Sequence, residues 1–129
     1  MKTAIAALLL ACLPLSVRAG ESSFVATYLT VAGDDGLTQR FAASLELSLS
    51  ESKFFEAPTT SKNGLILEIP SHLYWQEAQG TINFQYVVIF TDKSSKYLGV
   101  SIGSCWEKSM ARCANKVVSE ARKAWLRSR

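Results

Sequence analysis

Two segments of the chain carry hydrophobic residues at the spacing of an amphipathic helix. In the first, residues 37–50, Leu37, Phe41, Leu45 and Leu49 recur every four positions. A second apolar stripe runs through residues 107–126. Side chains three and four positions apart share one face of a helix. The pattern therefore predicts two helices, each with one buried face.

Four other segments have the composition or alternation of β-strands. Residues 24–32 are rich in β-branched and aromatic side chains, and residues 65–69 form a short apolar run. Residues 82–90 alternate at first and then become apolar throughout, which predicts a strand buried on both faces at its end. Residues 97–102 follow a polar turn and are expected to complete a hairpin with that strand.

Pro70 interrupts the second of these strands, because proline cannot donate to a β-ladder. Residues 73–75 then form either a separate strand or the second part of one bent strand. The element order is β-α-β-β-β-α, or β-α-β-β-α with one bent strand. This order predicts an α+β two-layer sandwich, with a mainly antiparallel sheet of four strands and two helices packed on one face. We expect the first strand to pair in parallel, across the helical crossover.

Residues 1–19 have the pattern of a secretory signal peptide. A basic start is followed by a short apolar run and by small residues at Val17 and Ala19. We expect cleavage after Ala19, which leaves residues 20–129 as a single periplasmic or secreted domain. The apolar run is shorter than the roughly 20 residues that span a bilayer, so we expect no transmembrane segment in the mature chain. Alternatively, the Leu-Leu-Ala before Cys12 is a lipobox, and the protein is a lipoprotein anchored through Cys12.

Charge is distributed unevenly along the chain. The 129 residues have a formal net charge of +3. Residues 20–105 contain 5 basic and 9 acidic side chains, whereas residues 106–129 contain 7 basic and 2 acidic ones. A basic helix near a carboxyl terminus is explained by the helix dipole. Because an exported protein also meets little nucleic acid, we expect no nucleic-acid partner.

Cys105 and Cys113 are the two cysteines that remain after processing. An even pair in an exported protein favours a disulfide. It would join the last strand to the last helix. The alternative is a pair of reduced, packed thiols.

Candidate catalytic chemistry is sparse. His72 is the only histidine, and no cysteine or carboxylate lies near it at metal-ligand spacing. Asp34 and Asp35 suit the start of a helix, where side-chain oxygens cap free N–H groups. We therefore predict no catalytic residue, no metal and no cofactor. A small hydrolase with an active site assembled from distant segments is the alternative, since the members of a Ser-His-Asp triad need not be adjacent.

The candidate binding residues are His72, Tyr74 and Trp75. Tyrosine and tryptophan combine a large apolar body with a polar tip and often dominate interfaces. Strand alternation places Leu73 and Trp75 on one face and His72 and Tyr74 on the other. It therefore predicts that Trp75 packs into the core and that Tyr74 is the more natural exposed anchor.

The chain resembles a group of small envelope domains. A strand, the Gly-Asp-Asp turn at residues 33–35, a helix with Phe41 that leads to Phe54, and a meander before an amphipathic helix resemble the small α/β amino-terminal domain of TolB and related bacterial envelope adaptor domains. Those domains dock other envelope proteins and have no catalytic residues. The resemblance implies an exported, non-enzymatic adaptor with an envelope or periplasmic protein partner. An inhibitor or immunity protein against an envelope hydrolase is the alternative.

Overall fold

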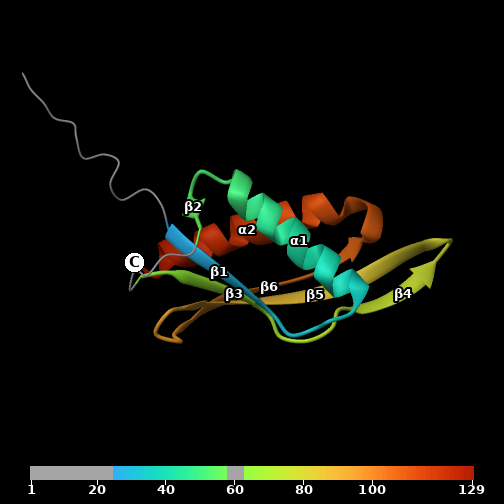
Figure 1. The fold of residues 1–129 in the computed structure, drawn as a ribbon, viewed down its shortest axis with the longest axis horizontal. Coiled ribbons are helices and arrows are strands. Elements are labelled where there is room, and N and C mark those ends of the chain that lie inside the picture. Colours follow the sequence, from blue (N-terminus) through green and yellow to red (C-terminus); the bar gives the residue numbers. More distant parts are fainter. Residues whose placement is uncertain (1–24, 58–62) are drawn as a thin grey trace, which may run out of the picture.

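The protein has two layers, a sheet and a pair of helices on one of its faces (Figure 1). The computed structural model describes residues 25–57 and 63–129. The expected signal peptide, Cys12 and most of the expected loop at 57–64 lie outside the described residues. The strands are β1 (Val25–Val31), β2 (Phe55–Glu56), β3 (Leu65–Ile69), β4 (Tyr74–Ala78), β5 (Thr81–Asp92) and β6 (Tyr97–Trp106). The helices are α1 (Gly36–Glu51) and α2 (Met110–Arg127), with a single 3₁₀ turn, Glu107–Ser109, before α2.

Strand β5 is the centre of the sheet. Both β3 and β4 pair with it in antiparallel fashion, β3 with its last residues and β4 with its first. Strand β6 pairs along the other edge of β5. β3 and β4 are thus two successive pieces along one edge, separated by the interruption at Pro70.

The remaining strands make the sheet mixed. β1 pairs with β3 in parallel, as predicted, and β2 pairs in parallel with β1. The prediction of four mainly antiparallel strands was wrong, because the described residues form a mixed sheet of six strands with two parallel pairings. One additional strand, β2, arises where buried Phe55 returns the chain to the core beside β1. The other is β4, because the segment after Pro70 forms a strand of its own. The α+β class and the placement of both helices on one face are confirmed (Figure 1).

The core lies between the helices and β5. Phe84, Tyr86, Val88 and Phe90 alternate along β5 and are all buried. Phe41 of α1 is fully buried on top of them, with ring centroids 5.3 Å from Phe84 and 5.2 Å from Tyr86. The side chains at every second position of β5 therefore pack against the apolar side chains that recur every four residues along α1.

No helix of the described residues lies on the opposite face of the sheet (Figure 1). Val87 on β5 and Val100 and Ile102 on β6 are exposed there. The predicted burial of both faces of the later part of β5 was therefore wrong. On β6 it is the small residues that face the helices: a Cβ at Gly99 would lie 3.4 Å from the Ala124 methyl of α2. Close packing of α2 requires small side chains on that face, so the branched ones face solvent.

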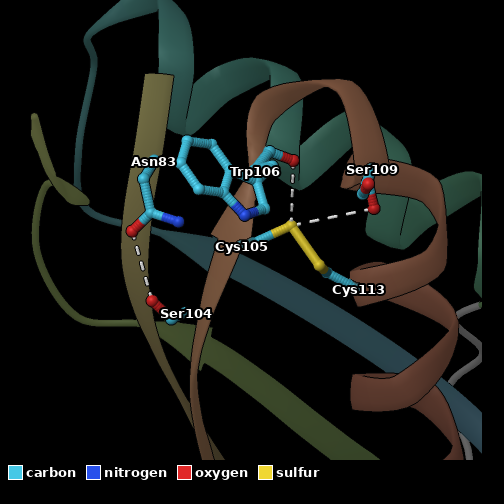
Figure 2. Close-up of a disulfide and its surroundings, with 6 residues drawn as sticks. All are labelled: Asn83, Ser104, Cys105, Trp106, Ser109 and Cys113. Carbon is cyan, nitrogen blue, oxygen red and sulfur yellow. Dashed lines mark hydrogen bonds between the residues drawn. A yellow bond between two sulfur atoms is a disulfide. The ribbon is translucent and has the colours of Figure 1, made fainter. Parts of the chain in front are cut away.

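A disulfide joins the end of β6 to the first turn of α2. The sulfurs of Cys105 and Cys113 lie 2.13 Å apart and their Cα atoms 6.3 Å apart (Figure 2). The Cys105 Sγ also lies 3.3 Å from the Trp106 carbonyl oxygen and 3.7 Å from that of Ser109. The structure thus contains the expected pairing, with Cys105 almost fully buried.

Removing the disulfide is expected to lower the free energy of unfolding by about 2–3 kcal/mol, because an eight-residue spacing closes a short loop of the unfolded chain. The measurement is urea denaturation of the oxidised protein and of the Cys105→Ala, Cys113→Ala double variant. Reducing the native protein should produce a similar loss. Equal stability of all three samples would contradict the expectation.

Candidate functional site

The interruption between β3 and β4 opens a groove on the helix-free face of the sheet. It has a volume of about 490 Å³ and is lined by residues 71–74, 85–87 and 102–104. The first set belongs to the interruption and the start of β4, and the other two belong to β5 and β6. Because Pro70 ends the β3 ladder, the backbone leaves the sheet edge at this point and leaves β5 uncovered.

The structure brings two of the three predicted binding residues together at this groove. His72 and Tyr74 both line it, and 67% of Tyr74 is exposed. Trp75 does not line it, because it points to the opposite face of β4, beside buried Phe84. The prediction that Trp75 belongs to the core was wrong, since 51% of it is exposed. The β4–β5 hairpin extends past the amino-terminal end of α1, so the helices do not cover that side of β4 (Figure 1).

Strand register makes the apolar side chains around the groove contiguous. Val87 pairs with Ile102, and Ile89 pairs with Val100, so these two rows are adjacent on the same face. Ile102 is 67% exposed. At the next row Gln85 pairs with both Tyr74 and Ser104. The Ser104 hydroxyl lies 3.2 Å from the Asn83 side-chain oxygen, which adds a polar border (Figure 2).

The contribution of β5 and β6 to this surface was not predicted from the sequence. Alternation along residues 97–102 places Val100 and Ile102 on one face of the strand, but it does not show which face the helices cover. The sequence feature that could have identified the helix-covered face is the small size of the residues on the other face of β6, because small side chains allow a helix to pack closely. These residues are Gly99, Ser101 and Gly103.

A hydrogen-bonded network fixes the groove to the start of α1. Asp35 caps the helix: its carboxylate accepts from the Thr38 N–H at 3.1 Å and from the Thr38 hydroxyl at 2.7 Å. The Thr38 hydroxyl oxygen in turn accepts from the Leu73 N–H at 3.0 Å. Thr38 is fully buried, so one side chain holds the helix terminus and the interruption together.

The same aspartate contacts the histidine. His72 Nδ1 lies 3.0 Å from Asp35 Oδ1, and His72 Nε2 lies 4.0 Å from Asp34 Oδ1. These partners of His72 were not predictable from the sequence, because the two aspartates lie in a distant segment. Within the described residues the imidazole has no hydrogen bond to a serine hydroxyl, and no group of three potential ligands could hold a metal ion.

The Asp35 carboxylate also contributes to stability. The hydroxyl of Thr38 donates to it and holds the pKa of Asp35 below its ordinary value, assisted by the Thr38 N–H and by nearby His72. Because the pKa is lower in the folded chain, this contribution is present above the unfolded pKa. It is lost as the pH falls through the folded value.

Comparison with known proteins gives no family. No protein-family model and no curated protein matches the chain. Among solved structures, a minor lipoprotein from Acinetobacter baumannii is 7% identical with a TM-score of 0.44, over 78% of this chain and 94% of that one. The PelC dodecamer from Paraburkholderia phytofirmans is 10% identical with a TM-score of 0.48, over 77% of this chain and 84% of that one. Neither is a TolB domain, and similarity at this level says nothing of function.

The described residues contain no helix with both the length and the apolar character needed to cross a bilayer.

Proposed function

We propose that this chain is an exported, non-enzymatic protein of the bacterial envelope that acts by binding another envelope protein. Two features support export. The first nineteen residues have the pattern of a signal peptide, and Cys105 and Cys113 form a disulfide, which is typical of oxidising compartments. The mature domain then begins at residue 20 and lies in the periplasm or outside the cell.

The observation that carries the binding role is the exposed face of the sheet. Tyr74, Val87, Val100 and Ile102 lie on one helix-free surface around the groove, bordered by Gln85 and Ser104. Contiguous exposed apolar side chains with a polar border mark interaction sites in soluble proteins. We call this surface, defined by these six residues, the open face. Its partner would cover the apolar centre and leave the border hydrated.

Ile102→Lys is expected to weaken partner binding at least tenfold, because it places a charge at the centre of a surface that must be desolvated. The mature chain is immobilised and incubated with an envelope extract, and the captured proteins are identified and then titrated in purified form.

Intact-mass spectrometry of the immobilised protein should show a chain that starts at residue 20 and in which both thiols are oxidised.

The matched control is Leu126→Lys, which adds the same charge at a leucine of α2 that is 51% exposed and lies away from the open face. It should retain the partner. Both variants should unfold at nearly the wild-type denaturant concentration, since exposed substitutions usually change stability little. If the two variants capture the same proteins equally well, the open face is not the binding surface.

The alternatives give different readouts. An inhibitor or immunity protein would capture an envelope hydrolase and suppress its activity. The hydrolase alternative is favoured by one observation, the contact between His72 and Asp35. It requires turnover of an ester or of peptidoglycan by the purified chain, abolished in His72→Ala. A chain that captures a partner and turns over neither substrate supports the binding role.

A further inference from the structure

Strand β6 is an edge strand of the sheet within the described part of the chain. Its ten residues pair with β5 on one side, and no described strand pairs with the other. On that side, alternate backbone N–H and C=O groups are available to a further strand. It is the longest such edge, since β4 at the other side of β5 has only five residues.

The sequence of β6 lacks the usual protection against strand pairing. Natural edge strands carry lysine, other charged residues, proline or bulges that prevent another chain from adding. Residues 97–106 contain no charged residue and no proline, and the irregularity in the β5 pairing lies at their very start, opposite Phe90 and Thr91. An edge strand without these features can accept an extended segment as an added strand.

Basic side chains of α2 flank this edge on the helix side. Three observations show that α2 runs antiparallel along β6: Cys113 bonds Cys105, Glu120 accepts from the Ser101 hydroxyl, and Arg127 lies 3.9 Å from where a Cβ of Gly99 would be. Lys116 and Lys123 follow Cys113 and Glu120 by three positions and so lie on the same side of the helix.

That side of α2 faces away from α1. The opposite side contacts α1, where the Ser48 hydroxyl donates to the Asn115 side chain at 2.6 Å. Lys116, Lys123 and Arg127 therefore form a basic stripe toward the free edge of β6. Among the described residues, none of these three cations forms an ion pair. The one carboxylate in the stripe, Glu120, already accepts from Ser101.

We propose that the partner adds an extended segment to β6 as a new edge strand, and that acidic and apolar residues alternate in this segment. Successive side chains of a strand point to opposite faces. The acidic ones would point toward the basic stripe, and the apolar ones would continue the row of Val100 and Ile102 on the open face. This inference rests on the proposed binding function and names the kind of partner.

Charge argues against a second copy of this chain as the occupant. Two chains paired edge to edge through β6 would bring two basic stripes next to each other, and like charges at an interface oppose association. β6 itself contains no acidic side chain to offset them. An acidic segment from another protein has the complementary charge.

The test uses a fluorescent nine-residue peptide in which glutamate and valine alternate, titrated against the oxidised mature chain by anisotropy. We expect binding that weakens as salt is added, because the attraction between exposed charges is screened. The same peptide with lysine in place of glutamate should not bind. Lys123→Glu should weaken binding by about tenfold, which corresponds to about 1.4 kcal/mol. Lys53→Glu, the same reversal at an exposed lysine beyond the end of α1, should leave binding unchanged.

Backbone methylation of the peptide tests strand addition directly. In an added strand, alternate N–H groups face β6 and the others face solvent. N-methylation of one alternate set should therefore abolish binding, whereas methylation of the other set should be tolerated. Strand addition would be overturned if methylation of each of the two sets abolished peptide binding, or if methylation of neither set did so.

The proposal also fails if the peptide does not bind, if the lysine peptide binds equally well, or if sedimentation shows that the chain dimerises through β6. These failures are separate from failure of the proposed function. Capture of an envelope partner that Ile102→Lys loses and Lys123→Glu keeps would leave the binding function standing and would reject strand addition. Absence of any captured partner, with the peptide not bound, would reject both.

Discussion

Phe41→Ala is expected to lower the free energy of unfolding by about 3–5 kcal/mol, among the largest effects of a single substitution in this protein. Phe41 is fully buried and its ring contacts those of Phe84 and Tyr86. Alanine would remove the apolar contacts that hold α1 on β5 and would leave a cavity that the surrounding rings cannot fill. The measurement is chemical denaturation of the oxidised mature chain, followed by circular dichroism.

Leu47→Ala is the matched control, because Leu47 lies on the same helix and is 58% exposed. It should change the free energy of unfolding by no more than about 0.5 kcal/mol. Similar losses for the two variants would mean that α1 does not pack on β5 through Phe41.

Gly103→Ala is expected to destabilise the fold by about 3 kcal/mol through overpacking. A Cβ at this position would lie 2.5 Å from the Tyr86 hydroxyl oxygen and 2.7 Å from its Cζ. Gly103 and Tyr86 are direct partners across β5 and β6, and the Tyr86 ring is buried, so it must shift against its packed neighbours to admit the methyl group. Thermal and urea unfolding of the variant provide the measurement.

Two comparisons separate the clash from a general glycine effect. Gly36→Ala introduces the same methyl group at the start of α1, where the nearest atom is an Arg40 guanidinium nitrogen at 3.8 Å, and should not destabilise. If the Tyr86 ring causes the loss, combining Gly103→Ala with Tyr86→Leu should destabilise less than the sum of the single effects. Additive effects would assign the loss to the strand backbone.

The elements that depend on local spacing were predictable from the sequence. The helix predicted at 37–50 is α1, and the stripe over 107–126 is α2 with its preceding turn. Both follow from apolar side chains one turn apart. The hairpin of β5 and β6 follows from alternation on either side of a short polar turn. There the Asp92 carboxylate accepts from the Ser94 hydroxyl, and this bond, with the Lys96 N–H, keeps the pKa of Asp92 low.

Features that depend on distant segments were not predictable. The contact between His72 and Asp35 joins the start of α1 to the interruption after β3. The sequence of neither segment predicts that the two lie close together. Exposure of Trp75 depends on how far the β4–β5 hairpin extends past α1, which is a matter of relative lengths and not of alternation. The binding surface was predicted in part. His72 and Tyr74 line the groove as predicted binding residues, but the exposure of Val87 and Ile102 depends on which face of the sheet the helices cover.

The central position of β5 also divides the chain into one part whose strand pairings are local in sequence and one part whose pairing spans a long loop. From β4 onward, each strand pairs with its neighbour in sequence, and the last strand is tied to α2 by a disulfide between positions eight apart. The amino-terminal part joins through the parallel pairing of β1 with β3, where Thr27 meets Leu65 across the whole of α1. Closing that long loop loses more chain entropy than closing a hairpin, and non-local contacts form more slowly. We therefore expect the carboxy-terminal hairpins to form first and β1 and α1 to pack onto them afterwards.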